Sequence, residues 1–185
     1  MFTMMRDSRG VWLSLLATLV FAAGCATAGA QGKASDDEKK KPVDHYNVPK
    51  SKLAIEGYDP VAYFPEGGKK PKKGKKEHEL VLDGVKYRFV SKKNLEAFEK
   101  NPQKYMPAYG GWCAFAMADG EKVSVNPKAY RVTDGRLYLF YTSFFTDTRK
   151  SWKKNEAKLA NDADGHWKKI AGEEPRKGGK KAGAN

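Results

Sequence analysis

The chain has 185 residues, with 35 Lys and Arg against 22 Asp and Glu, which gives a net charge of +13. A length of this order is enough for one domain that buries its own core, and leaves no room for several. Much of the basic charge lies in two runs, KKPKKGKK (69–76) and RKGGKKAGAN at the C-terminus. Both runs are mixed with Gly or Pro, a composition typical of solvated loops and tails, so a nucleic-acid-binding face is not favoured.

The N-terminus is typical of a signal peptide. Two arginines precede the apolar run VWLSLLATLVFAA (11–23), which is too short to span a bilayer comfortably. Cleavage before Gln31 fits the small residues Ala28-Gly29-Ala30, which makes 1–30 the signal peptide. FAAGC (21–25) is a looser match to a lipoprotein signal, with lipid attached at Cys25. We therefore expect an exported protein, periplasmic or extracellular, that is either free or anchored to the membrane through Cys25.

Composition divides the rest of the chain into three parts. Residues 31–50 are polar and are expected to form a disordered tether, 51–172 the folded domain, and 173–185 a disordered basic tail. Exported proteins rarely meet nucleic acid, so we expect no such partner. A weak contact between the lysine runs and an anionic envelope surface is the more sensible expectation.

Local patterns predict the first half of the domain. A turn at GYDP (57–60) leads into a short strand over 61–64. Alternating residues around Asp83-Gly84 predict a hairpin of 79–82 and 86–90. Ser91 can cap a helix that runs to Lys100 and ends at Asn101-Pro102.

The second half repeats this order. Gly110-Gly111 opens a helix at Cys113 that Asp119-Gly120 closes, and a hairpin of 129–133 and 136–141 turns at Asp134-Gly135. The spacing of apolar residues from about 146 to 170 indicates a helix that Gly165 breaks or bends. The predicted fold is α+β, with one small antiparallel sheet of hairpins and helices packed mainly on one side.

The two hairpins share a pattern. VLDGVKYRFVS and VTDGRLYLFYT, which begin at Val81 and Val132, both read V-x-D-G-x-x-Y-x-F-x-[S/T] at an offset of 51 residues. Hairpins with D-G turns and inward aromatic residues recur independently, which is one interpretation. The other is an internal pseudo-repeat, in which two hairpin-helix halves enclose a shared groove.

LDGVKYRFVSKKNLEAFEKNPQKY (82–105) resembles the YHS domain in its G-x-x-Y-x-F-x-S…F…P-x-x-Y skeleton. GYDPVAYF and YGGWCA flank it as in the exported group of YHS domain-containing (seleno)proteins, and the resemblance runs from about Ala54 to Trp167. YHS domains occur in copper-transporting ATPases and some oxygenases, so the resemblance implies metal binding, with copper or another soft metal as the ion. The short metal-associated versions use cysteine and histidine at the positions of Val90, Asn94 and Arg88, which cannot bind a soft metal here.

Cys113 is the one remaining candidate for this chemistry, because Cys25 is either removed or lipidated. It is predicted in the first turn of a helix, where free backbone N–H groups favour a thiolate. Met117 lies four residues on, on the same helical face, and thiolate with thioether suits Cu(I). A buried, inert core cysteine is the competing interpretation. Further candidates for the pocket are Tyr58, Asp59, Tyr109 and Trp112.

Three functions follow as hypotheses. The first is an exported YHS-type binding protein that holds copper or another soft metal through Cys113 and Met117. The second is a thiol-dependent redox protein or sensor that uses Cys113 alone. The third is a structural or interaction module of the cell envelope. A non-enzymatic role is favoured over an enzymatic one because no pattern of catalytic residues stands out. Exposure of Cys113 discriminates among them, since burial among aromatic residues argues against the first two.

Overall fold

The computed structural model describes residues 42–176, and the predicted signal peptide, Cys25 and most of the C-terminal tail lie outside them. Within these residues the fold is α+β, as predicted. No helix in this part of the chain is long and apolar enough to cross a membrane.

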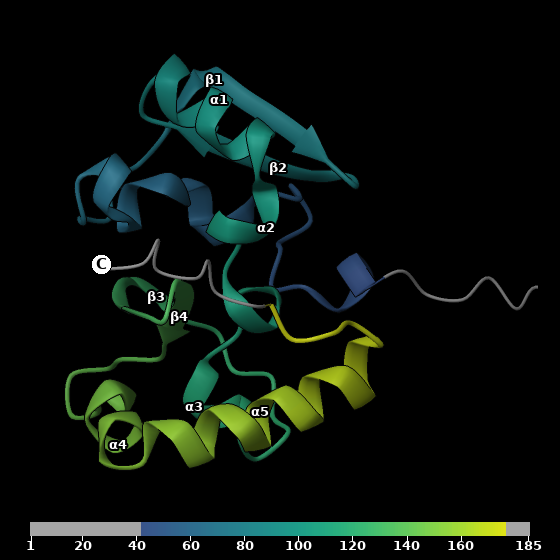
Figure 1. Cartoon of the computed structure of the whole chain (residues 1–185), viewed down its shortest axis with the longest axis vertical. Helices are drawn as coiled ribbons and strands as arrows, with labels where there is room; N and C mark the ends of the chain where they lie inside the picture. The colour runs from purple at the N-terminus through teal and green to yellow at the C-terminus, as the bar shows by residue number, and fades with distance from the viewer. Residues whose placement is uncertain (1–41, 177–185) are drawn as a thin grey trace, which may run out of the picture. The chain divides into compact units, whose positions relative to one another are not determined.

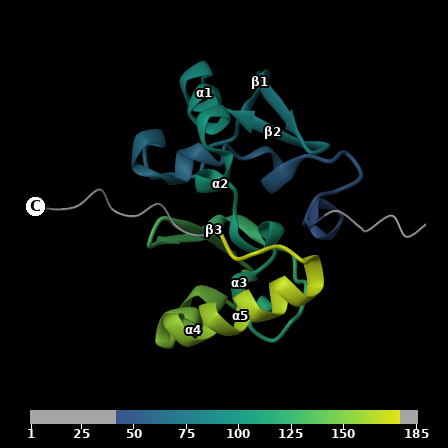
Figure 2. The ribbon, with the colours of Figure 1, turned by 45° about the vertical axis from the view of Figure 1, so that its right-hand side comes forward.

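Two β-hairpins organise the fold, and each forms its own antiparallel two-stranded sheet instead of sharing one. The strands are β1 (Lys75–Leu82), β2 (Val85–Phe89), β3 (Asn126–Thr133) and β4 (Arg136–Phe140). The predicted turns are confirmed: Asp83-Gly84 and Asp134-Gly135 have positive φ angles, as two-residue hairpin turns require. Figures 1 and 2 show β1 and β2 at one end of the folded unit, with α1 packed on them, and α4 and α5 at the other end.

Short helices connect and cover the hairpins. The α-helices are α1 (Lys92–Lys100), α2 (Pro102–Tyr105), α3 (Ala114–Met117), α4 (Thr148–Lys154) and α5 (Glu156–Ala171). Single 3-10 turns are η1 (Pro42–His45), η2 (Ala54–Gly57), η3 (Val61–Tyr63), η4 (Pro65–Gly67) and η5 (Ala108–Gly111). Ser91 caps α1 as predicted, because its hydroxyl accepts the Asn94 N–H at 3.3 Å.

Two predicted elements differ. The predicted strand over 61–64 is instead the turn η3 (Val61–Tyr63), because the Asp59 carboxylate accepts the N–H groups of Val61 and Ala62 and so starts a helical turn. The long C-terminal helix breaks at Asn155, between α4 and α5, and continues through Gly165. Asn155 has φ −151°, which ends α4 and starts α5.

The domain boundaries are also wider than predicted. Val43, Tyr46 and Val48 pack against the core, although they fall in the predicted tether. At the other end Arg176 is buried, and its guanidinium donates to the Tyr46 hydroxyl at 2.6 Å and to Glu173 at 2.7 Å. The sparse apolar residues of 42–50 therefore close the fold together with the first residues of the predicted tail.

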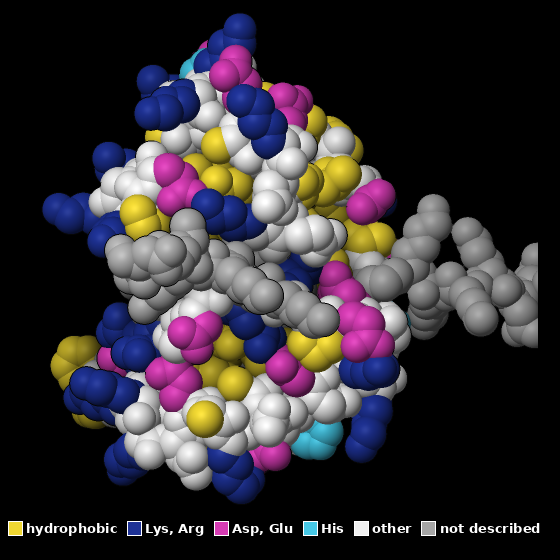
Figure 3. Space-filling model, in the orientation of Figure 1, with side chains coloured by type: hydrophobic (Ala, Val, Ile, Leu, Met, Phe, Trp, Pro, Cys, Tyr) yellow, Lys and Arg dark blue, Asp and Glu magenta, His cyan; other side chains and the backbone are white. Residues whose placement is uncertain are grey.

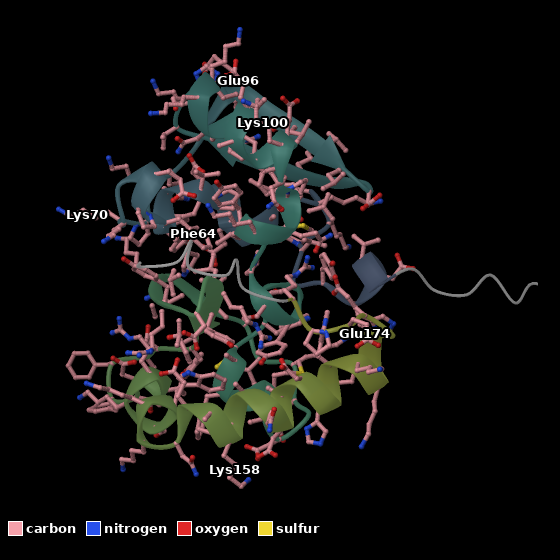
Figure 4. The ribbon with its side chains drawn as sticks, in the orientation of Figure 1. Phe64, Lys70, Glu96, Lys100, Lys158 and Glu174 are labelled. Atoms are coloured by element: carbon pink, nitrogen blue, oxygen red, sulfur yellow. The ribbon has the colours of Figure 1, made fainter. Side chains whose placement is uncertain are left out.

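The lysine run 69–76 has exposed side chains, as expected, and Figure 4 shows that of Lys70 pointing away from the folded unit. Its backbone, however, forms defined hydrogen bonds to the segment 59–64. Lys70 N–H donates to the Ala62 carbonyl at 2.9 Å, and the Lys72 carbonyl accepts the Asp59 N–H at 2.9 Å. The last two residues of the run already belong to β1.

The two hairpins match in register as well as in turn. Each shows four successive pairs next to the turn and then a bulge, before Glu79 in β1 and before Tyr130 in β3. Tyr87 and Tyr138 are both buried, and their rings lie 4.8 Å from Phe98 and 5.1 Å from Trp152. An internal pseudo-repeat, which requires the two units to superpose, stays a prediction.

Candidate functional site

Cys113 lies directly before α3 and is the N-cap residue of that helix. Helix α3 has only four residues, so it supplies little of the helix dipole that was expected to favour a thiolate. The side chain of Cys113 is 0% exposed. Among the described residues Cys113 is the one cysteine, and it forms no disulfide.

The Cys113 sulfur has two polar neighbours, one directly after β4 and one at the start of α4. Sγ accepts the backbone N–H of Tyr141 at 3.3 Å and lies 3.6 Å from the Thr148 hydroxyl. The same hydroxyl donates to the Tyr141 carbonyl at 2.9 Å. The thiol thus ties α3 to the connection between β4 and α4.

Met117 lies one helical turn from Cys113, because its N–H donates to the Cys113 carbonyl at 3.0 Å. The side chain is fully buried in the cluster that also contains Phe140, Trp152 and Trp167. A thioether in such a cluster is an ordinary core residue. Among residues 42–176 no three of the His, Cys, Asp and Glu side chains are grouped so that they could hold a metal ion.

The pocket around the double glycine differs from the prediction. Tyr58 and Asp59 were expected to share this pocket with Tyr109 and Trp112. A side chain at Gly110 would instead meet Tyr46 at 2.7 Å and Trp167 at 2.9 Å. The double glycine is therefore needed for the N-terminal segment, whose Asn47 side chain donates to the Gly111 carbonyl at 3.1 Å.

Tyr109 and Trp112 also serve this packing. The Tyr109 hydroxyl donates to Asp164 at 2.9 Å, and burial raises the pKa of Tyr109 far above its ordinary range. Asp164 also holds the Arg136 guanidinium at 2.6 Å. The Trp112 indole N–H donates to the His45 carbonyl at 2.7 Å. Both residues join η5 to neighbouring segments.

Asp59 is fully buried and its carboxylate is saturated with hydrogen bonds. Oδ2 accepts the Val90 N–H at 2.8 Å and the Asn94 amide at 2.7 Å, and Oδ1 accepts the Val61 N–H at 2.8 Å. Tyr58 is half-buried, and the Lys73 ammonium lies over its ring at 5.4 Å from the ring centre. The predicted candidates are thus divided: Tyr58 and Asp59 join the first hairpin, and Cys113 the second.

One feature of this region was not predicted from the sequence. Phe144 and Phe145 are adjacent and almost fully exposed in the connection between β4 and α4. The signal was present in the sequence TSFFTDT, where two aromatic residues interrupt an otherwise polar loop.

Comparison of the chain with models of protein families, with curated proteins and with solved structures finds no match.

Proposed function

We propose that this chain is a YHS-type domain that acts as an interaction module of the cell envelope, in which Cys113 is a structural residue. The observation that carries the proposal is the burial of the Cys113 thiol, whose polar neighbours are a backbone N–H and a threonine hydroxyl. Neither neighbour is a soft-metal ligand, and a fully buried sulfur is closed to a redox partner.

The first hairpin supports this interpretation of Cys113. Asp59 lies two residues before η3 and Cys113 directly before α3, and each follows a run of three positive φ angles by two residues. Asp59 accepts the N–H of Val90, the residue after β2, and Cys113 accepts that of Tyr141, the residue after β4. In the proposed pseudo-repeat the two side chains share one bracing role, with a carboxylate in one half and a thiol in the other.

Export and the envelope location come from the signal-like N-terminus, and the YHS assignment from the motifs quoted above. Soft-metal binding through Cys113 and Met117 and redox chemistry at Cys113 are the alternatives. Each requires the sulfur to meet a reagent or an ion from solvent. Both alternatives therefore require a solvent-accessible thiol in the folded protein, and the structural role does not.

Alkylation of the native protein with iodoacetamide, read by mass spectrometry of the peptide that contains Cys113, separates these functions. We expect modification of Cys113 only after denaturant is added. Cu(I) titration against a chromophoric chelator should give the same stoichiometry for the native chain and for Cys113→Ala. Rapid alkylation of the folded protein, or a Cu(I) site that Cys113→Ala removes, would overturn the proposal.

A further inference from the structure

The connection between β4 and α4 exposes two phenylalanines at its tip. Phe144 is 93% and Phe145 92% exposed, and their rings pack on one another at 4.8 Å between centres with an interplanar angle of 81°. Single exposed apolar residues are common on protein surfaces, but an adjacent pair of fully exposed aromatic rings is a feature of binding surfaces.

The tip is held in a defined turn. Ser143 N–H donates to the Thr146 carbonyl at 2.8 Å, and Thr142 pairs with Asp147 in an antiparallel bridge. The Asn126 amide donates to the Thr142 hydroxyl at 2.9 Å, which fixes the base of the turn to β3. Figure 1 shows the connection between β4 and α4 looping out at the left edge of the view. The two rings are therefore presented to solvent by an ordered turn.

The hairpin-helix arrangement does not require this turn. In the first half only Val90 and Ser91 separate β2 from α1. In the second half residues 141–147 separate β4 from α4. The two phenylalanines thus lie in added chain that contributes no buried apolar surface to either core cluster. Their presence calls for a role outside folding.

The surroundings of the turn are basic. An open groove of about 330 Å³ lies beside the phenylalanines, and the exposed residues Lys128 and Lys150 line it together with threonine and serine. The acidic residue of the groove, Asp147, is paired with Arg149 at 2.6 Å. Figure 3 shows hydrophobic side chains at this lower left edge next to Lys and Arg side chains. The groove therefore offers positive charge and hydrogen-bond donors.

We infer that the turn from Thr142 to Asp147 docks the protein on an anionic lipid bilayer. The rings of Phe144 and Phe145 enter the boundary between headgroups and acyl chains, and Lys128 and Lys150 meet lipid phosphates. The inference rests on the proposed function, because it names the surface with which the interaction module makes contact. A second copy is disfavoured as the occupant, since a chain of net charge +13 would bring lysines against lysines.

Sedimentation of the full-length chain with vesicles tests the inference. One set contains equimolar phosphatidylglycerol and phosphatidylcholine, and the other phosphatidylcholine alone. We expect Phe144→Ser/Phe145→Ser to weaken partitioning onto the anionic vesicles at least tenfold. Val81→Ser, at an exposed apolar residue of β1, is the matched control and should stay within twofold of the unchanged chain. All chains carry the same N-terminus, because the apolar run 11–23 can itself bind lipid.

Two double variants of equal net charge test how much the lysines beside the turn contribute to vesicle binding. Lys128→Glu/Lys150→Glu should weaken binding to the anionic vesicles about tenfold. Lys92→Glu/Lys93→Glu makes the same change of net charge on α1, far along the chain from the turn, and should have a much smaller effect. Equal losses in the two variants would mean that net charge alone attracts the protein, which contradicts docking through the turn.

Fluorescence measures insertion of the turn into the bilayer separately from any lipid binding by the N-terminus. In the Phe145→Trp variant, brominated phosphatidylcholine mixed into the anionic vesicles should quench emission more than it does in the unchanged chain. Equal quenching, or unchanged partitioning of the double Phe variant, would overturn the inference. So would a dimer in lipid-free solution that the double Phe variant converts to a monomer. The outcome of the vesicle experiments does not depend on the reactivity of Cys113. The reactivity of Cys113 tests only the proposed function.

Discussion

Asp59 and Cys113 accept the same kind of hydrogen bond in two different hairpin units. The N–H of Val90 meets Asp59 Oδ2 at 2.8 Å, and the N–H of Tyr141 meets Cys113 Sγ at 3.3 Å. Each acceptor also contacts a polar side chain of the next helix, Asn94 in α1 and Thr148 in α4. Both side chains therefore fasten the segment before the hairpin to the helix after it.

The chemical difference between the two acceptors predicts unequal costs of removal. Asp59→Ala leaves several buried donors without an acceptor and should lower the free energy of unfolding by about 3 kcal/mol or more. Cys113→Ala removes a weaker acceptor and leaves a small cavity, for a loss of about 1 to 2 kcal/mol. Urea denaturation followed by circular dichroism measures both. Glu77→Ala, at an exposed position of β1, is the control and should change little.

Two glycines, Gly74 and Gly165, should respond in opposite directions to substitution by alanine. A side-chain carbon at Gly74 would lie 2.3 Å from the Arg88 carbonyl carbon, so Gly74→Ala should destabilise by about 2 to 3 kcal/mol. Gly165 lies inside α5, where an added side-chain carbon would meet no atom within 4 Å beyond the adjacent helix backbone, so Gly165→Ala should stabilise by about 1 kcal/mol. A stabilised Gly74→Ala protein in the same denaturation experiment would mean that the hairpin does not pack against this segment.

Stability should fall as the pH rises above 10. Burial raises the pKa of Tyr138 to about 12, and the side chain is 4% exposed. An unfolded tyrosine loses its proton near pH 10, whereas folded Tyr138 retains it, so the unfolded state is favoured increasingly between pH 10 and 12. The expected loss is about 1.4 kcal/mol per pH unit for this residue. Below pH 10 both states are protonated and the contribution is constant.

The contribution of Tyr138 is separated from that of the other tyrosines by substitution. Tyr138→Phe removes the titrating hydroxyl and should flatten the pH dependence of the unfolding free energy between pH 10 and 12. Tyr141→Phe, at an exposed position, serves as the control and should leave the dependence unchanged. Identical slopes for Tyr138→Phe and the unchanged chain would show that Tyr138 titrates normally in the folded state.

Local chemistry explains which elements could be predicted from the sequence. Asp83-Gly84 and Ser91 act within a few residues, so the hairpin turn and the start of α1 follow from their residue types alone. The Asp59 contact that starts η3 is equally local, two to three residues along the chain, whereas Gly110 is required by the approach of Tyr46, which is distant in the sequence. The burial of Cys113 likewise depends on Tyr141 and Thr148. Such long-range contacts leave no periodic pattern in a single sequence.

Two variants of the lysine run 69–76 separate the contribution of its side chains to stability from the contribution of its backbone. The side chains of Lys70 and Lys72 are exposed, so Lys70→Ser/Lys72→Ser should leave the melting temperature within about 2 °C of the unchanged chain. Deletion of 69–73 removes backbone groups that pair with Ala62, Phe64 and Asp59, and should lower it by about 10 °C or more. Thermal melts followed by circular dichroism measure both variants. If the deletion melts like the unchanged chain, the run is a dispensable loop, and the backbone bonds at Asp59 contribute little to stability.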